Sequence, residues 1–140
     1  MIGIVIVAHG GLAREYLAAV EHVVGTQQGI QSIAIEADCD RATKQKEICL
    51  AADAVDQGQG VVVVTDMFGG SPSNLSLMAC QPDNRRILYG ANLPMLIKLA
   101  KSRHLPVPDA VRQALEAGRK YIDSVNIKSD DGSDAAAKTA

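Results

Sequence analysis

Two runs of β-branched residues constrain the fold of this chain most. Residues 2–8 read IGIVIVA, and residues 61–64 are four consecutive valines. A strand with one face in water alternates apolar and polar residues, but these two runs are apolar at almost every position. Strands covered on both faces have this composition, and they are typical of parallel sheets that lie between layers of helices. The sequence therefore predicts an α/β fold.

Segments with helical periodicity alternate with the predicted strands. We expect strands at residues 2–8, 30–37, 61–66 and 86–91, and helices at residues 12–24, 41–57, 72–80, 94–103 and 108–120. This order predicts an open, mainly parallel sheet of strand order 2-1-3-4 with helices on both faces. Residues 121–127 are a further short candidate strand, which would join the edge of this sheet or of a partner's.

Length and composition limit the domain organisation and the class of function. Residues 1–127 are expected to form one domain, and residues 128–140, which are small and polar, a disordered tail. The net charge of -2 and the lack of basic runs argue against nucleic acid as a partner. Three cysteines without CxxC spacing (Cys39, Cys49 and Cys80) are interpreted as reduced, buried thiols. With no signal peptide or apolar run of about 18 residues, we expect a cytoplasmic protein.

Two predicted strands end in ionisable residues. The first strand is followed by His9 and the third ends at Asp66. Ligands bind parallel sheets beyond the carboxyl ends of the strands, where the strand order reverses, and in a 2-1-3-4 sheet this point lies between strands one and three. We therefore expect His9 and Asp66 to be neighbours, with the GANLP segment at residues 90–94 on the same rim.

This pair suits a group held on histidine. A carboxylate that accepts a hydrogen bond from one ring nitrogen fixes the tautomer and leaves the other nitrogen free to attack. Glycine pairs at residues 10–11 and 69–70 allow the backbone to approach a bulky group closely. Ser71 is predicted as the N-cap of a helix with Pro72 at its first position, and a helix start favours an anion. A phosphoryl group on His9 fits all of these features.

Other interpretations stay open from the residues alone. His9 and Asp66 each have a structural interpretation, as a core histidine and a turn residue, and His22 and His104 are taken as structural. A receiver domain also has an aspartate after its third strand, but it needs an acidic pair after the first, where this chain has Ala8-His9-Gly10. A small tetrapyrrole metal chelatase using His9 is the main alternative. The chain has no GxxxxGK[ST] motif for nucleotide phosphates.

Three segments carry a family resemblance. "VVTDMFGGSPSNLSL", with "IVAHGG" and "GANLPML", resembles the enzyme IIA domain of the mannose-type (mannose/fructose/sorbose) phosphoenolpyruvate-dependent sugar phosphotransferase system, over residues 1–127. The resemblance implies that His9 is phosphorylated, that Asp66 orients it, and that Ser71 with the backbone at Gly69 and Gly70 holds the phosphoryl group. It implies no cofactor and no metal. Partner contacts are expected at four positions of the rim, namely Gly10, Phe68, Asn92 and Pro94.

The resemblance also implies partners and an assembly. Family members accept the phosphoryl group from the histidine-containing phosphocarrier protein and pass it to an enzyme IIB, which phosphorylates a sugar during uptake through a membrane permease. They are cytoplasmic dimers whose C-terminal strand crosses to the partner's sheet, and they meet the membrane transiently. Met67 departs from the small or polar residue expected before the aromatic Phe68. No enzyme IIB domain follows in this chain, so a regulatory role stays open beside transport.

Overall fold

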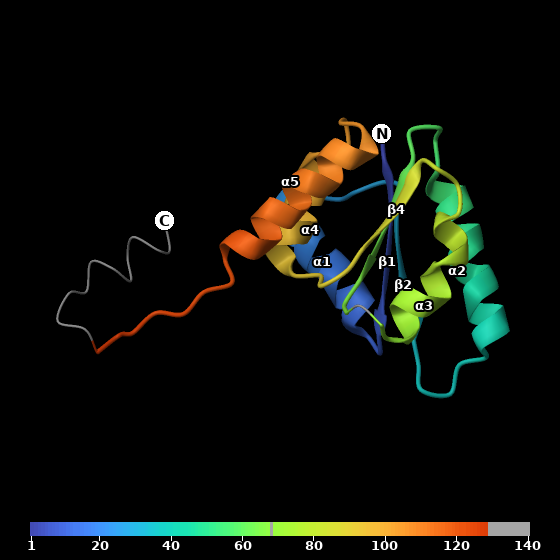
Figure 1. Ribbon diagram of the computed structural model, residues 1–140, viewed down its shortest axis with the longest axis horizontal. Helices are drawn as coiled ribbons and strands as arrows, with labels where there is room; N and C mark the ends of the chain where they lie inside the picture. Colours follow the sequence, from blue (N-terminus) through green and yellow to red (C-terminus); the bar gives the residue numbers. More distant parts are fainter. Residues whose placement is uncertain (68, 129–140) are drawn as a thin grey trace.

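The computed structural model describes residues 1–67 and 69–128, which form a three-layer α/β domain (Figure 1). Four strands make the central layer, in chain order β1 (Gly3–His9), β2 (Ile30–Ile35), β3 (Val61–Thr65) and β4 (Arg85–Leu88). The helices are α1 (Leu12–Val24), α2 (Arg41–Val55), α3 (Ser71–Ser76), α4 (Leu93–Lys101) and α5 (Val107–Lys120), with a short 3₁₀ turn η1 at Met78–Cys80.

The sheet has the predicted order and direction. Its strands run β2-β1-β3-β4, and all neighbouring pairs are parallel. Val5 of β1 lies opposite Gln31 of β2 and Val63 of β3, so β1 and β3 form the centre of the sheet. The prediction of an open parallel sheet in the order 2-1-3-4 is confirmed.

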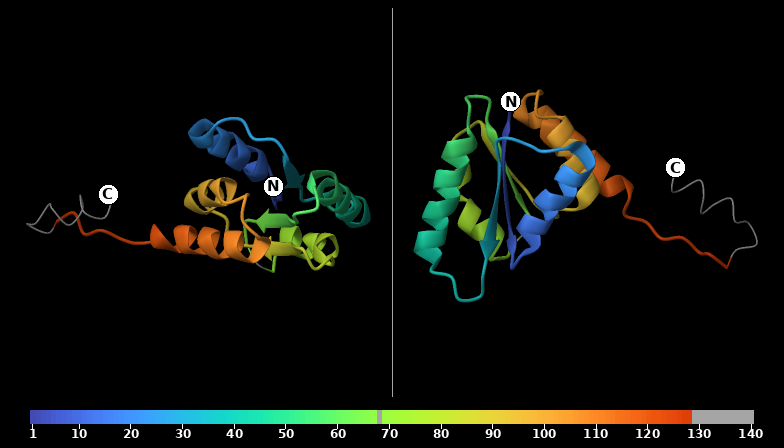
Figure 2. Two further views of the ribbon diagram at one scale, coloured as in Figure 1. Left: turned by 90° about the horizontal axis from the view of Figure 1, so that it is seen from above. Right: turned by 180° about the vertical axis from the view of Figure 1, so that it is seen from behind.

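Alternate residues of the central strands fill two separate cores. On one face Ile4, Ile6, Val62 and Val64 pack against helices α1, α4 and α5, and on the other Val5, Val7, Val61 and Val63 pack against α2 and α3. Figure 2 shows the sheet between these two sets of helices. Burying each of these side chains contributes about 1.5–3 kcal/mol. This two-sided burial explains why the strands read as unbroken apolar runs.

Two predicted elements differ from the observed ones. The helix expected at residues 72–80 is interrupted after Ser76, whose Oγ donates to the carbonyl of Pro72 at 2.6 Å and offers the backbone a competing bond. Strand β4 ends at Leu88 instead of continuing to residue 91. There the chain turns at Gly90, with φ of +79°, and the Ala91 amide bonds the carbonyl of Thr65 at 3.1 Å.

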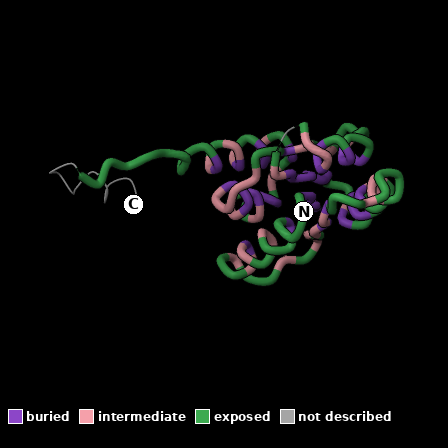
Figure 3. Tube along the Cα trace, turned by 90° about the horizontal axis from the view of Figure 1, so that it is seen from below, coloured by how far each residue is buried: buried purple, intermediate pink, exposed green. Residues whose placement is uncertain are grey.

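Residues 121–127 form no strand within the single chain. They leave the end of α5 as an exposed, extended segment that points away from the domain (Figures 1 and 3). Strand addition to the chain's own sheet is therefore not observed, and exchange with a partner stays a prediction. The predicted disordered tail, residues 128–140, lies outside the described residues apart from Lys128. Across the described ranges no helix has the length and apolar character needed to cross a membrane.

Candidate active site

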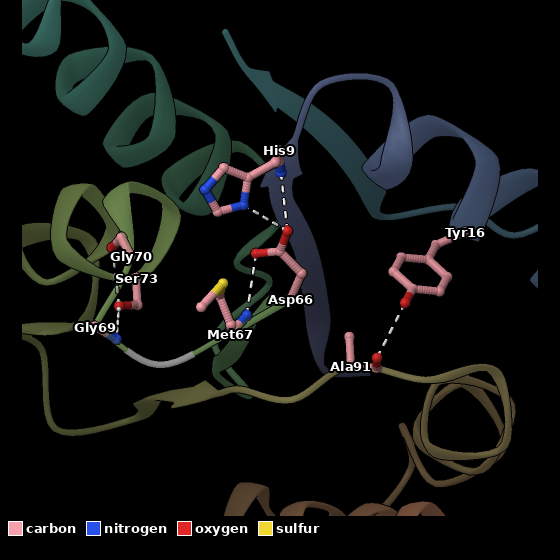
Figure 4. Close-up of polar contacts among 8 residues, drawn as sticks. All are labelled: His9, Tyr16, Asp66, Met67, Gly69, Gly70, Ser73 and Ala91. Atoms are coloured by element: carbon pink, nitrogen blue, oxygen red, sulfur yellow. Dashed lines mark hydrogen bonds and ion pairs between the residues drawn. The ribbon is translucent and has the colours of Figure 1, made fainter. Parts of the chain in front are cut away.

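The structure brings His9 and Asp66 together at the carboxyl end of the sheet. His9 is the last residue of β1, and Asp66 directly follows β3 on the neighbouring strand. Val7 pairs with Thr65, so β1 extends two residues beyond the end of β3 and His9 lies one register position past Asp66. The ring Nδ1 of His9 lies 2.7 Å from Oδ2 of Asp66, and the His9 amide donates to the same oxygen at 3.1 Å (Figure 4). One carboxylate thus fixes both the backbone and the ring of His9.

The carboxylate is more enclosed than the histidine it orients. The side chain of Asp66 is 12% exposed, whereas that of His9 is 50% exposed. Burial alone would raise the pKa of Asp66, but the hydrogen bonds from the His9 ring and amide outweigh it and hold that pKa below its ordinary value. Asp66 is therefore an anion near neutral pH, and it accepts a hydrogen bond from the protonated Nδ1 of His9. The lone pair of His9 is then on Nε2.

Nε2 of His9 lies on the side of the ring away from Asp66, next to the loop before α3 (Figure 4). A Cβ added to Gly70 would lie 3.3 Å from Cε1 of His9 and 3.7 Å from Nε2. Glycine at this position therefore lets the loop pack against the reactive edge of the ring. Gly69 adopts φ of +84°, a conformation that side chains other than glycine rarely take.

An open cavity of about 550 Å³ adjoins His9. It is lined by His9, Gly10, Gly11, Ile35, Glu36, Ala37, Cys39, Arg41 and Ser71. The cavity therefore joins the ends of β1 and β2 to the starts of α2 and α3, and it is large enough for a phosphoryl group and part of a donor.

The predicted capping role of Ser71 is wrong. Gly70 is the N-cap of α3 and Ser71 is its first residue, so Pro72 stands at the second position. Ser73 stabilises this start instead, since its Oγ accepts from the Gly69 amide at 3.0 Å and donates to the Gly70 carbonyl at 3.2 Å. The Ser71 hydroxyl is thereby released from the backbone and lines the cavity, where it accepts a 3.4 Å hydrogen bond from Nη1 of Arg41.

Of the remaining rim residues, Asn92 and Pro94 do not line the cavity. Asn92 caps α4 by accepting from the Met95 amide at 3.0 Å, and its side-chain amide donates to the carbonyl of Gly118 at 2.9 Å. Pro94 lines a different groove, between α4 and α5. The positions of both side chains thus have a structural explanation within the single chain. Phe68 lies outside the described residues.

Sequence patterns alone missed several residues of this site. Arg41 and Cys39 line the cavity, and Ser73 organises the loop at Gly69 and Gly70. Tyr16 of α1 lies to one side of the pair, beyond Asp66 as seen from His9, and donates to the carbonyl of Ala91 at 3.0 Å (Figure 4). Burial, with the nearby Asp66 charge, raises the pKa of Tyr16, which keeps it a neutral donor. The strand order offered one signal for Cys39 and Arg41, because both follow β2, whose carboxyl end lies on the same rim as His9.

Histidine, cysteine and carboxylate side chains do not gather in groups that could hold a metal ion in the part of the chain that the structure describes. The cysteines Cys39, Cys49 and Cys80 are free thiols of intermediate exposure, so the expectation of fully buried thiols is wrong. Burial raises the pKa of Cys80 to about 11, which makes this thiol unreactive near neutral pH.

Fold and site together define an α/β protein with an aspartate-oriented histidine at the switch point of a parallel sheet. The family described as "PTS system fructose IIA component" (EIIA-man) matches residues 3–134, and the chain belongs to this family. It is a phosphotransferase-system EIIA-type protein of the mannose family, and EIIA components of this system are phosphotransferase proteins. The family assignment favours phosphoryl transfer over the chelatase and receiver alternatives.

Individual relatives agree with this assignment. The mannose-specific EIIAB component of Escherichia coli (strain K12) is 27% identical over 130 residues, which cover 91% of this chain and 40% of that protein. The chain thus spans less than half the length of this relative. The structure of phosphotransferase system component EIIA from Streptococcus agalactiae is 27% identical, with a TM-score of 0.74 and coverage of 89% of this chain and 97% of that one. The mannose/sorbose specific IIA subunit from Enterococcus faecalis, at 22% identity, TM-score 0.80 and coverage of 89% and 95%, shares the fold.

Proposed function

We propose that this protein carries a phosphoryl group on Nε2 of His9, within a carrier domain formed by residues 1–127. The observation that carries the proposal is the 2.7 Å contact between Nδ1 of His9 and Oδ2 of Asp66. It leaves the opposite ring nitrogen with its lone pair at the half-exposed edge of the ring, beside an open cavity. A nucleophile in this position can receive a phosphoryl group from another protein and give it up again.

The transfer step is a displacement at phosphorus. The lone pair of Nε2 attacks the phosphorus of a phosphohistidine on the donor protein, the new N–P bond forms, and the donor's N–P bond breaks with its electron pair returning to the donor ring. His9 then carries a substituent on Nε2 and a proton on Nδ1, so its ring is cationic. The Asp66 carboxylate stabilises this cation at hydrogen-bond distance, and the reverse displacement by an acceptor regenerates neutral His9.

The proposed donor is the histidine-containing phosphocarrier protein, and the proposed acceptor is an enzyme IIB. Membership of the phosphotransferase system, in which EIIA proteins act within a chain of phosphoryl transfers, supports these partners. The exposed position of His9 supports protein partners, because a ring at the surface can be reached by a second protein. We further propose a cytoplasmic site of action with transient contact to a permease. The role is in carbohydrate uptake or in its regulation.

We also propose a homodimer in which residues 121–127 add to the partner's sheet. Two features support it. Strand β4 lies at the edge of the sheet, beside a groove of about 470 Å³ whose lining includes Ile87, Leu88 and Val111. The extended segment carries apolar side chains that are exposed in the single chain, including Ile122 at 73% and Ile127 at 87%. A partner strand on β4 would cover both surfaces.

The direct test is phosphorylation in a reconstituted system. Given phosphoenolpyruvate, enzyme I and the phosphocarrier protein, the chain should gain one phosphoryl group that is labile in acid and stable in alkali, as expected for phosphorus on nitrogen. His9→Ala should abolish labelling. His22→Ala and His104→Ala are matched controls, because both histidines are exposed and lie away from the cavity, and they should label normally. Label that persists in the His9→Ala protein would contradict the proposal.

A further inference from the structure

Arg41 is a cationic side chain beside His9 that the sequence patterns did not identify. It is the first residue of α2, and it lines the same cavity as His9 and Ser71. Its Nη1 donates a 3.4 Å hydrogen bond to Oγ of Ser71, which directs the guanidinium across the cavity mouth from α2 towards α3. Residues from the ends of two strands and the starts of two helices therefore converge on one space.

The charge of Arg41 is exposed and has no carboxylate partner within the described ranges of the chain. Arg41 takes part in none of the salt bridges found there, and its bond to the Ser71 hydroxyl is long for a charged donor. The neighbouring carboxylate of Asp40 accepts from the Thr43 hydroxyl. A cation at the N-terminus of a helix also opposes the helix dipole. The exposed guanidinium of Arg41 is therefore solvated and not committed to a carboxylate, so it is available to an anion in the cavity.

We propose that Arg41 binds the phosphoryl oxygens of the group carried on Nε2 of His9, with the Ser71 hydroxyl as a second donor. The inference rests on the proposed function, and it adds a phosphoryl-binding residue to it. When the phosphoryl group arrives, the guanidinium exchanges its weak bond to Ser71 for charge-assisted bonds to two phosphoryl oxygens. The freed Ser71 hydroxyl turns to donate to the same group. A planar guanidinium suits this exchange because it offers paired N–H donors.

Other ionisable groups face the same space and set the balance of charge. Glu36 and Cys39 line the cavity from the loop after β2, and Asp66 lies on the far side of the His9 ring. The carboxylate of Glu36 repels a phosphoryl dianion and so opposes Arg41. We expect Arg41 and Glu36 together to hold the phosphoryl group firmly enough to position it and weakly enough for its transfer to an acceptor.

The test uses chemical phosphorylation, which is independent of the protein donor. Phosphoramidate would be used to place a phosphoryl group on His9 of the full chain, and the phosphorus-31 resonance would be followed against pH. A nearby guanidinium favours the dianion, so Arg41→Ala should raise the pKa of the second phosphoryl ionisation, by about half a unit or more at this exposed site. Arg41→Lys keeps the positive charge but loses the paired N–H donors of the guanidinium. Its pKa for the second phosphoryl ionisation should lie between those of the unmutated and the Arg41→Ala proteins. Arg112→Ala on α5 is the matched control and should titrate as the unmutated protein does.

The same variants are then compared in the reconstituted system. Arg41→Ala should slow phosphorylation by the phosphocarrier protein about 10-fold or more, while the final label stays on His9 and the melting temperature is unchanged. An Arg41→Ala protein that titrates and transfers like the unmutated protein would overturn the inference and leave His9 as carrier intact. If phosphoramidate modifies His9 but the phosphocarrier protein does not, the proposed function fails while the titration still decides the role of Arg41. A His9 that phosphoramidate cannot modify would overturn both.

Discussion

At the scale of single residues, the site depends on the three hydrogen bonds that one carboxylate, that of Asp66, accepts. Asp66 accepts from the His9 ring, from the His9 amide and, at 3.0 Å through Oδ1, from the Met67 amide. Three donors hold the carboxylate in one orientation, so it can select one histidine tautomer. Asp66 thus acts on phosphoryl transfer through the ring of His9, as a positioning residue.

The first prediction concerns Asp66→Asn. The amide keeps the shape of the side chain but can present an N–H to Nδ1, which favours the wrong tautomer and removes the charge that stabilises the cationic ring. Phosphorylation of His9 by the phosphocarrier protein should slow by up to about four orders of magnitude, the effect of the same substitution in a Ser-His-Asp catalytic triad, with the fold retained. Rapid-quench labelling measures the rate, and circular dichroism the fold. Asp109→Asn on α5 is the control and should be phosphorylated at the normal rate. A normal rate for Asp66→Asn would show that Asp66 has only a structural role in the turn.

At the scale of elements, Arg85 links β4, a strand at the edge of the sheet, to helix α2. Its side chain is 8% exposed, and Nη2 contacts Asp53 at 2.8 Å and Asp56 at 3.1 Å, both near the end of α2. The two carboxylates differ in exposure, at 65% for Asp53 and 16% for Asp56. The hydrogen bond from the Gly58 amide is the largest influence on Asp56, and with Arg85 it holds the pKa of Asp56 below its ordinary value despite burial.

The second prediction follows from this difference. Because the folded state lowers the pKa of Asp56 from 3.8, its charged form contributes stability that is fully present above that pH and is lost as the pH falls through the folded pKa. Asp56→Asn should therefore lower the free energy of unfolding at pH 7 by about 1–3 kcal/mol, with a deficit that shrinks in acid. Asp53→Asn, at the exposed contact, should cost less than about 1 kcal/mol. Urea denaturation across the pH range measures both, and equal deficits at all pH values would contradict the assignment.

Elements also show what could and could not be predicted from the sequence. The strands β1 and β3 follow from their apolar runs, because burial on both faces leaves a pattern in the sequence. The neighbouring positions of their ends follow from the predicted strand order, whose reversal lies between them. The break after Ser76 does not, since it depends on a side chain competing for a carbonyl within one turn. The contact between Arg41 and Ser71 joins residues 30 positions apart through two loops. Its geometry depends on tertiary packing and has no periodic signal.

At the scale of the whole molecule, the single chain leaves complementary surfaces uncovered. The edge of β4 lies at one side of the sheet, and the segment beyond α5 extends from the domain (Figure 1). Tyr121 and Val125, in addition to Ile122 and Ile127, are exposed along that segment. Apolar side chains on an extended segment are expected to find a sheet edge, and the partner copy supplies one.

The third prediction tests this assembly by truncation. Ending the chain at Lys120 removes the exposed apolar segment and should give monomers or aggregates in sedimentation velocity experiments. Ending it at Lys128 is the matched control, because it removes only the polar residues 129–140 and should leave the dimer, the melting temperature and phosphoryl transfer nearly unchanged. A stable dimer after truncation at Lys120 would contradict strand exchange, and a large loss of stability after truncation at Lys128 would show that the tail packs.

The position of β1 at the centre of the sheet has a consequence for synthesis on the ribosome. This strand is made before both of its neighbours, β2 and β3, and one side of it stays unpaired until Val61–Thr65 has emerged. A nascent chain therefore carries an apolar strand with an open backbone edge for much of translation, when it is prone to premature association. His9 likewise exists without its carboxylate until Asp66 is made. Pairing of β1 with β3 and the positioning of the reactive histidine are thus expected to occur together.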